Sequence, residues 1–338
     1  MEAKALISVV VPVYNEEAVI NVFHSRILAV MDTLSDYYWE ILFVNDGSYD
    51  NSQKIIDSIC SADARFGNVS LSRNFGKEIA MTAGLDYAGG AAVVIIDVDL
   101  QDPPELIADF VREWCQGYDV VYAKRTHRDG ETWLKKATAA GFYRVIHKMS
   151  RIDIPTDAGD FRLMSRRAVA ALAQLREQHR FMKGLFAWIG FPSIAVEYRR
   201  EPRAAGATKF NYWKLWNFAL EGITSFSIEP LKIATYIGLL TAFFSFSYGA
   251  WIAAKTLIWG DPVRGYPTIM VTILLLGGIQ LFSIGVLGEY LGRIFSETKQ
   301  RPLYFIQGYK PSGHPTPSGE VPQTTGEGKP AFHSDETS

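Results

Sequence analysis

The chain has 338 residues, of which 48% are hydrophobic and 21% are charged, and its formal net charge at pH 7 is -2. This length suits one large or two ordinary domains. The balanced charge, without a basic stripe interleaved with aromatic residues, argues against a nucleic-acid-binding protein. The high apolar content indicates instead that part of the chain meets lipid.

From residue 6 to about residue 125, short β-rich runs alternate with helix-length amphipathic stretches. This alternation predicts βαβ units, and hence an α/β fold with a mainly parallel sheet. The predicted strands are 6–11, 40–44, 69–71, 92–96 and 120–122. The predicted helices are 17–34, 51–62, 77–88 and 104–115, with Asp102 as a cap before the last of these. A less regular section, 126–211, contains predicted helices 132–148 and 165–178 and a strand 194–198.

Two carboxylates, Asp97 and Asp99, directly follow the apolar run 92–96, and Pro103 and Pro104 then end the segment. Consecutive apolar, mostly β-branched residues are typical of a strand that is buried on both faces. Ligands of open α/β sheets gather at the carboxyl ends of such strands, where carboxylates can hold a divalent cation. An Asp-x-Asp pattern alone can also be a solvated turn or a helix cap, so its position after the strand carries the prediction.

The first two predicted strands also end in polar loops, which contain Tyr14, Glu16 and Asp46. The pair Asp46-Gly47 by itself could equally form a turn without a binding role. Acids at the ends of three neighbouring strands favour a binding site. A carboxylate such as Asp46 can accept the imide N–H of a uracil, and Tyr14 can lie against the base. A metal ion held by Asp99 would bridge two phosphates.

Two apolar segments, 231–254 and 267–291, are each about 24 residues long, or about 36 Å as helices. This length spans the hydrocarbon core of a bilayer, about 30 Å thick, so we expect a two-helix transmembrane hairpin within 230–293. Two buried helices of a soluble core are the alternative. Lys and Arg are frequent on both outer flanks and rare in the connecting loop. This distribution predicts a multi-pass inner-membrane protein whose catalytic domain and both termini are cytoplasmic.

The segments around the hairpin have compositions of their own. Aromatic residues and Lys214 in 212–229 predict a helix that lies in the membrane interface. We expect 294–310 to be a cytoplasmic juxtamembrane segment and 311–338, rich in Pro, Gly, Ser and Thr, to be disordered. Gly288-x-x-x-Gly292 matches the small-residue pattern of helix contacts, which leaves a homo-oligomer open.

Four stretches together resemble glycosyltransferase family 2, whose catalytic domain has the GT-A fold. They are Pro12-Val13-Tyr14-Asn15-Glu16, Asn45-Asp46-Gly47-Ser48, Arg73-Asn74-Phe75-Gly76-Lys77 and Asp97-Val98-Asp99-Leu100-Gln101-Asp102-Pro103-Pro104. The two apolar segments and Gly206-Ala207-Thr208-Lys209-Phe210 make the chain similar to the polyprenyl-phosphate glycosyltransferases, which include dolichol-phosphate mannosyltransferases and bactoprenol glucosyltransferases. The resemblance implies a Rossmann-like GT-A domain over 1–211, followed by the hairpin.

The resemblance also implies a reaction. A sugar, glucose by preference, would pass with inversion from a UDP-sugar to a polyprenyl phosphate such as undecaprenyl phosphate, with Mg²⁺ or Mn²⁺ as cofactor. The residues implied for the nucleotide-sugar are Pro12, Tyr14, Glu16, Asp46, Asp97 and Gln101. The residues implied around the metal ion are Asp99, as the first choice, with Asp97 and Gln101.

On the acceptor side, the resemblance implies Arg125 and Asp157, and Asp157 is the usual candidate for a general base. A phosphomonoester has a second pKa near 6, so its oxygen is largely deprotonated at neutral pH and Asp157 can serve to orient the acceptor instead. Asp157 and Asp160 can also merely cap the helix that begins at Ser165. The candidates for the lipid phosphate are Arg200, Arg203 and Lys209, which can equally bind anionic head groups without a catalytic role.

Smaller alternatives remain open. Lys77 is interpreted as a first-turn or surface residue of its helix rather than as a phosphate ligand, and 180–184 as either a mobile segment over the donor or the start of a packed helix. A polysaccharide synthase of the same fold is disfavoured by the two spans and by the missing Gln-x-x-Arg-Trp motif. The alternative from a different functional class is a non-catalytic nucleotide-binding membrane scaffold or lipid carrier subunit, which would have the same α/β domain and helical hairpin.

Overall fold

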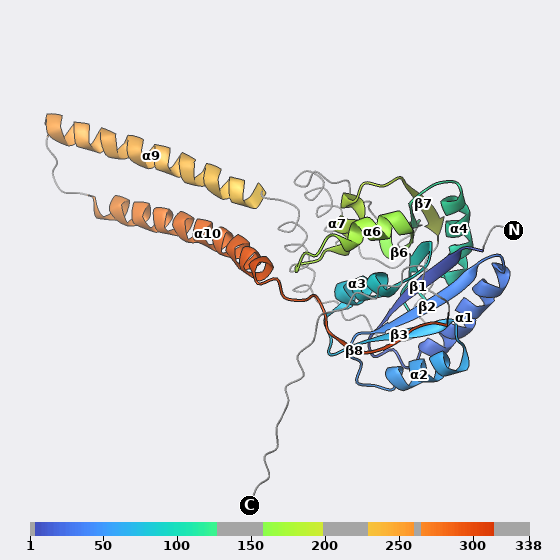
Figure 1. Cartoon of the computed structure of the whole chain (residues 1–338). Coiled ribbons are helices and arrows are strands. Elements are labelled where there is room, and N and C mark those ends of the chain that lie inside the picture. The colour runs from blue at the N-terminus through green and yellow to red at the C-terminus, as the bar shows by residue number, and fades with distance from the viewer. Residues whose placement is uncertain (1–3, 127–157, 199–228, 260–264, 314–338) are drawn as a thin grey trace, which may run out of the picture.

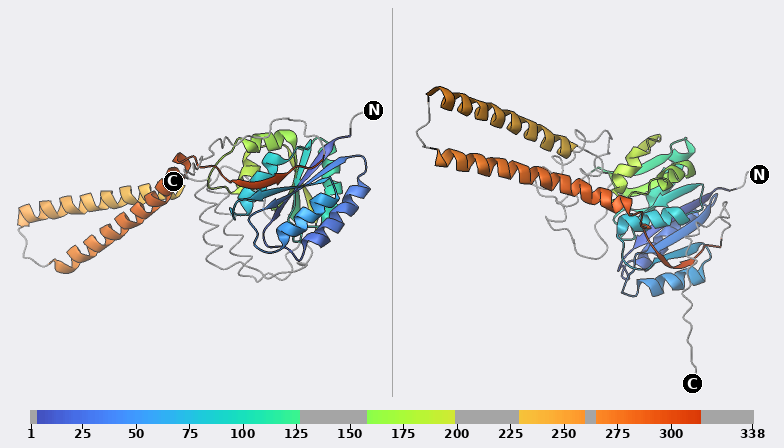
Figure 2. Two further views of the ribbon diagram at one scale, coloured as in Figure 1. Left: turned by 60° about the horizontal axis from the view of Figure 1, so that its bottom comes forward. Right: turned by 60° about the vertical axis from the view of Figure 1, so that its left-hand side comes forward.

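The structure, a computed structural model, describes residues 4–126, 158–198, 229–259 and 265–313 (Figure 1). A sheet with helices on both faces forms an α/β domain, and a helical hairpin projects away from it, as Figure 2 shows from two further sides. This is the mainly parallel α/β architecture with a C-terminal hairpin that the sequence predicts.

One eight-stranded sheet has the order β7-β5-β6-β4-β1-β2-β3-β8. Its strands are β1 (Leu6–Val13), β2 (Tyr38–Asn45), β3 (Phe66–Leu71), β4 (Ala92–Ile95), β5 (Val120–Arg125), β6 (Ala158–Ser165), β7 (Ser193–Tyr198) and β8 (Ile306–Lys310). Strands β6 and β8 run antiparallel to their neighbours, and the others share one direction. From β1 the chain proceeds through β2 to β3 on one side, whereas β4 pairs with the other side of β1. The carboxyl ends of β1 and β4 therefore flank a topological switch point, where open α/β sheets bind ligands.

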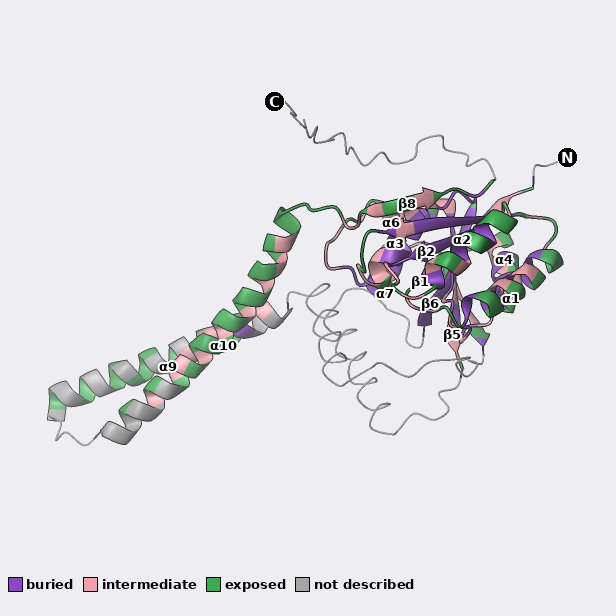
Figure 3. Ribbon diagram, turned by 90° about the horizontal axis from the view of Figure 1, so that it is seen from below, coloured by how far each residue is buried: buried purple, intermediate pink, exposed green. Residues whose placement is uncertain are grey.

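Helices cover both faces of the sheet. They are α1 (Ile20–Thr33), α2 (Ser52–Ala62), α3 (Lys77–Tyr87), the 3₁₀ turn η1 (Pro104–Leu106), α4 (Ile107–Cys115), α6 (Arg166–Ala173) and α7 (Met182–Trp188). Because side chains alternate along a strand, Val9 and Val11 pack into the core beside α1, α2 and α4, and Val10 packs beside α3. Figure 3 shows this buried interior between the helices. Burial on both faces explains why β1 and β4 are continuous apolar runs.

The hairpin consists of α9 (Glu229–Trp259) and α10 (Tyr266–Thr298), which pack side by side. Among the described residues, one stretch, Leu275–Thr298 of α10, is long and apolar enough to cross a membrane, and none of it is buried by protein. A shorter apolar stretch, Ala234–Tyr248, lies in α9. The exposed stretch in α10 excludes a buried core helix there and agrees with membrane association.

Two strands were not expected from the sequence. β6 (Ala158–Ser165) lies in the less regular section 126–211, where no strand was predicted before residue 194, and β8 lies within the predicted juxtamembrane segment 294–310. Ser165 does cap the following helix, since its Oγ accepts from the Ala168 N–H at 3.3 Å, but α6 ends at Ala173 rather than at 178. The predicted helix 132–148, residues 212–228 of the predicted interfacial helix 212–229, and residues 314–338 of the predicted tail 311–338 lie outside the described residues.

Candidate active site

The loops after β1 and β2 are joined by hydrogen bonds between side chains and backbone. Asn15, which adopts a φ of 54°, accepts through Oδ1 from the Tyr49 N–H at 3.0 Å, and Ser48 Oγ accepts from the Asn15 N–H at 3.0 Å. The rings of Tyr14 and Tyr49 meet edge to face at 6.0 Å, and Tyr49 is 83% exposed. This loop pair thus presents two accessible aromatic rings at the switch point.

Asp46 fixes the loop between β3 and α3. Its Oδ1 accepts from the Phe75 N–H at 2.7 Å and its Oδ2 from the Gly76 N–H at 2.9 Å, and the residue is buried. Burial raises the pKa of Asp46, and these two backbone donors oppose that rise. Gly47 (φ 68°) lies so close that a Cβ there would come within 2.5 Å of the Arg73 carbonyl carbon, so only glycine fits. Asp46 therefore organises the loop that leads to Lys77, in addition to any contact with a nucleotide.

The loop after β4 carries the candidate metal ligands. Leu100 has a φ of 58°, and Asp99 Oδ1 accepts from the Gln101 N–H at 3.2 Å, so the chain turns sharply here. Gln101 Oε1 is buried and has no hydrogen-bond partner in the described part of the chain. An unpartnered buried carbonyl oxygen is costly, so this oxygen is suited to accept a ligand.

Lys77, the first residue of α3, bridges two acids. Its Nζ lies 2.7 Å from Asp97 Oδ1 and 2.6 Å from Asp160 Oδ2. Burial disfavours the ammonium ion, but the two carboxylates together outweigh burial and hold the pKa of Lys77 above its ordinary value. Lys77 is the first residue of α3, as expected, and its side chain is 41% exposed, but its ammonium group is paired with two acids.

The acids around Lys77 respond differently to their surroundings. Burial raises the pKa of Asp97, with Lys77 opposing and Asp160 adding to the rise. For Asp160, burial is outweighed by Lys77 and Lys183, so its pKa is lowered. Burial, with Asp160 nearby, raises the pKa of Glu78 to about 7, although Glu78 accepts from the Met182 N–H at 3.0 Å. These shifts mark a dense charge network at one edge of the sheet.

Arg125 lies at the end of β5 in a second polar cluster. Its Nε donates to the Tyr198 hydroxyl at 3.2 Å, and that hydroxyl donates to the buried carboxylate of Asp102. Asp102 is therefore not the helix cap that the sequence predicts, because η1 begins without a side-chain cap. Instead, Tyr198 and Asp102 orient the guanidinium of Arg125.

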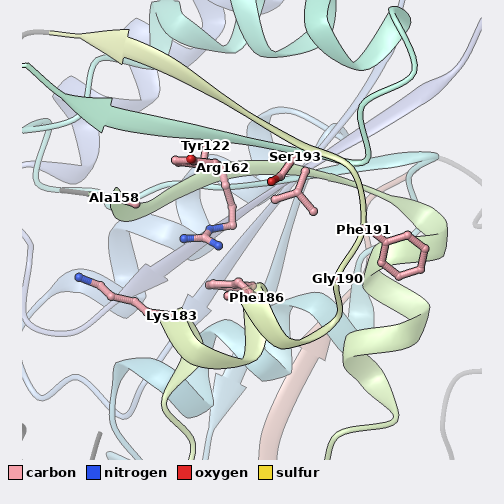
Figure 4. Close-up of a pocket in the computed structure, with 10 residues that line it drawn as sticks. Tyr122, Ala158, Arg162, Lys183, Phe186, Gly190, Phe191 and Ser193 are labelled. Atoms are coloured by element: carbon pink, nitrogen blue, oxygen red, sulfur yellow. The ribbon is translucent and has the colours of Figure 1, made fainter. Parts of the chain in front are cut away.

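A cavity of about 160 Å³ lies between α7 and strands β5, β6 and β7 (Figure 4). The guanidinium of Arg162 lies inside it, 3.6 Å from the centre of the Phe186 ring, and Lys183 lines the same end. Arg162 donates to the backbone carbonyls of Gly159 at 2.7 Å and Asp160 at 3.3 Å, so its hydrogen bonds go to backbone and not to the Asp160 carboxylate. Burial lowers the pKa of Arg162 to about 10.

The segment 180–184 forms a packed helix start rather than a mobile cover. Arg180, Phe181 and Met182 are buried, and α7 begins at Met182. Arg180 donates to the Leu175 carbonyl, which further fixes the segment. Of the two alternatives left by the sequence, the structure supports the helix.

The residues present suit a hard divalent cation. Across the described ranges, no group of three His, Cys, Asp or Glu side chains is preassembled around a metal position. Nevertheless, the carboxylates of Asp97 and Asp99 share one loop with the unpartnered Gln101 Oε1. Mg²⁺ and Mn²⁺ take carboxylate and carbonyl oxygens, and Mg²⁺ commonly keeps waters and substrate phosphates as its other ligands, so an incomplete protein shell is the expected arrangement.

The structure brings together most of the predicted site residues. Those at the carboxyl ends of β1, β2, β4 and β5 are Pro12, Tyr14, Glu16, Asp46, Asp97, Asp99, Gln101 and Arg125. The predicted residues Asp157, Arg200, Arg203 and Lys209 lie outside the described residues. The roles of Lys77 and Asp160 in the charge network were not predicted from the sequence, although the Gly76-Lys77 pair beside the predicted site was a usable signal.

Comparison with known proteins agrees with this geometry. The model of glycosyl transferase family 2 matches residues 8–172, and that of the GtrB C-terminal hairpin matches residues 229–294. The fold and the site define a GT-A enzyme of the transferase class. The chain belongs to glycosyl transferase family 2 and is a glycosyltransferase.

Two relatives match over almost the whole chain. A glycosyltransferase of Synechocystis sp. is 53% identical over 89% of this chain and 94% of its own. The bactoprenol glucosyl transferase of Shigella phage SfV is 52% identical over 90% of this chain and 99% of its own. Among solved structures, glucosyl-3-phosphoglycerate synthase from Mycobacterium tuberculosis, in complex with Mn²⁺, UDP and phosphoglyceric acid, has a TM-score of 0.44 and 19% identity over 65% of this chain and 76% of that chain.

Proposed function

We propose that this glycosyltransferase moves glucose from UDP-glucose to a polyprenyl phosphate, undecaprenyl phosphate in a bacterial membrane, on the cytoplasmic face. The observation that carries the proposal is the convergence of Asp97, Asp99 and Gln101 with the loops of Tyr14 and Asp46 at one sheet edge. The bactoprenol glucosyl transferase of phage SfV, 52% identical to this chain, supports the acceptor and the sugar.

In this proposal, the loops after β1 and β2 bind the uridine, with Tyr14 against the base and Asp46 holding the neighbouring loop. Asp99, with Asp97 and Gln101, would hold Mg²⁺ or Mn²⁺, which when bound neutralises charge on the leaving diphosphate. An oxygen of the lipid phosphate attacks the anomeric carbon from the face opposite UDP. The bond from that carbon to the diphosphate oxygen breaks, so the configuration is inverted.

The enzyme contributes alignment and charge to this displacement. Arg125, whose Nε donates to the Tyr198 hydroxyl, would bind the incoming phosphate, because a guanidinium makes bidentate contacts with phosphate oxygens. Asp157 orients the acceptor, whose oxygen needs no base at neutral pH.

We further propose that α9 and α10 both span the bilayer and deliver the acceptor to this site. The apolar stretch Leu275–Thr298 and the predicted spans 231–254 and 267–291 support this topology. Arg200, Arg203 and Lys209, together with an interfacial helix over 212–229, would hold the lipid phosphate beside the membrane surface. Both termini then lie in the cytoplasm.

The proposal is tested with Asp99→Ala in membranes supplied with radiolabelled UDP-glucose and a polyprenyl phosphate. We expect transfer to fall roughly a hundredfold or more, the scale seen when a group that stabilises transition-state charge is removed. Asp57→Ala, an exposed acid on α2, is the matched control and should transfer normally. Unchanged transfer by Asp99→Ala would show that the site is not used as proposed, and elongation of a glycan chain would identify a polysaccharide synthase.

A further inference from the structure

Lys77 connects the loop after β4 with the beginning of β6. Its ammonium nitrogen lies 2.8 Å from Asp97 Oδ2, 20 residues further along the chain, and 2.6 Å from Asp160 Oδ2, 83 residues further along. The side chain of Lys77 is 41% exposed and those of Asp97 and Asp160 are 26% and 14% exposed, so water screens these ion pairs in part. One cation thus joins the loop of the candidate metal ligands to the beginning of β6.

This arrangement needs explanation, because a cation at the first position of a helix opposes the helix dipole. Gly76 has a φ of 96°, a conformation that glycine adopts without strain. Its N–H donates to Asp46 Oδ2. The backbone before α3 therefore places Lys77 at the first position of the helix. The carboxylates of Asp97 and Asp160 offset the unfavourable interaction of the Lys77 ammonium with the helix dipole. Without a cation between them, these two carboxylates would repel each other. Asp160 faces Lys183 and Arg162 as well, but each of these lies on the β6 and α7 side, away from the loop after β4.

We propose that Lys77 is a positioning residue whose ammonium serves as the internal counter-ion of Asp97 and Asp160 and holds the metal-binding loop against β6. In its metal-binding part, this inference rests on the proposed function. When a divalent cation binds the loop, the Asp97 carboxylate is already oriented by Lys77. The cation must, however, compete with the Lys77 ammonium for that carboxylate. Loss of the Lys77 charge therefore loosens the loop and at the same time leaves an acid pair that attracts cations more strongly.

The positioning role is tested without metal or substrate, by hydrogen exchange on the full-length protein. In Lys77→Met, backbone amides of 96–101 and 158–162 should exchange faster than in the parent, because the ion pairs that join them are gone. Lys77→Arg keeps the charge and should exchange nearly as the parent does. Lys54→Met, an exposed lysine on α2, is the control. Unchanged exchange at both segments in Lys77→Met would overturn the proposal.

The counter-ion role is tested by Mn²⁺ binding, followed by electron paramagnetic resonance in the presence of UDP. We expect Lys77→Met to bind Mn²⁺ roughly tenfold more tightly, the scale by which a nearby unit charge shifts an ionic equilibrium, and to have a lower kcat. Lys77→Arg should restore both values. Equal or weaker binding by Lys77→Met, alongside lost binding by Asp99→Ala, would contradict the inference and leave the proposed function standing. Absence of Mn²⁺ binding by the parent would contradict the proposed metal site, and the hydrogen exchange result would still decide the role of Lys77.

Discussion

Ser312 donates a hydrogen bond of 2.9 Å to Oε1 of Glu40, a buried carboxylate 272 residues earlier in the chain. Glu40 also accepts from Ser8 Oγ and from the Gly89 N–H, so Ser312 completes a buried cluster at the amino end of the sheet. The chain that leaves α10 therefore returns to the catalytic domain, first as β8 and then at Glu40. Residues 299–313, here called the C-terminal strap, tie the hairpin to the sheet.

The strap is fixed at its other end as well. The Gln178 N–H donates to Glu297 Oε1 of α10 at 2.7 Å, and the Tyr304 hydroxyl donates to Asp86 Oδ2 at 2.7 Å. The rings of Tyr87 and Tyr309 lie 4.7 Å apart. Because Asp86 and Tyr87 end α3, whose first residue is Lys77, the strap contacts one end of this helix and the candidate site lies at the other.

Replacing Ser312 with alanine should destabilise the catalytic domain. The change leaves Glu40 Oε1 buried without this donor, which typically costs about 1–3 kcal/mol. We expect a lower thermal midpoint in detergent for Ser312→Ala and no change for Ser25→Ala, an exposed serine that bonds only within α1. An equal midpoint for both variants would show that the strap adds no stability.

Asp46→Asn should weaken both the fold and the binding of UDP. An amide offers one acceptor where the carboxylate offers two, and its NH₂ group would face a backbone N–H, so one of Phe75 and Gly76 loses its partner. The expected cost is about 1–3 kcal/mol, measured by chemical denaturation, together with a weaker affinity for UDP in calorimetry. Asp57→Asn on the surface of α2 is the control. Parent-like stability of Asp46→Asn would mean that Asp46 does not organise the loop before α3.

Tyr198→Phe should slow turnover through Arg125. The variant removes the hydroxyl that accepts from Arg125 Nε and donates to Asp102, so the guanidinium is less firmly oriented while its charge remains. We expect kcat to fall roughly tenfold, which corresponds to about 1.4 kcal/mol, and Tyr38→Phe on the exposed end of β2 to be normal. A normal kcat for Tyr198→Phe would show that turnover does not depend on the orientation of Arg125 by the Tyr198 hydroxyl.

Stability should fall in weak acid because of His24. Burial lowers the pKa of His24, Asp63 opposes this shift, and its Nε2 is buried without a partner in the described residues. As the pH falls through about 6.5, the ordinary pKa of histidine, His24 binds a proton in the unfolded chain but stays neutral in the folded chain. Protonation therefore favours unfolding and stability is lost. His24→Phe, beside Phe66, should lose less stability between about pH 7 and pH 5.5. Identical pH profiles of the thermal midpoint would contradict this.

The central strands and the acids that follow them could be predicted from the sequence, because β1, β2 and β4 are buried on both faces and each contains an apolar run, 9–13, 41–44 and 92–95. β8 could not, since its five residues Ile306–Lys310 have no strand pattern of their own and become a strand only by pairing with β3. The same holds for Lys77, whose partners depend on how α3, β4 and β6 meet in space. Asp102 was misread as a cap because its partner, Tyr198, lies 96 residues away.

The most direct test is the chemical identity of the product formed from UDP-glucose and undecaprenyl phosphate by the purified full-length protein. UDP-glucose carries an α linkage, so a single displacement by the lipid phosphate should give undecaprenyl phosphate glucose with a β linkage, which nuclear magnetic resonance of the anomeric proton distinguishes. An α-linked product would contradict direct inversion. Absence of transfer to the lipid phosphate, with UDP-glucose consumed elsewhere or not at all, would contradict the proposed reaction itself.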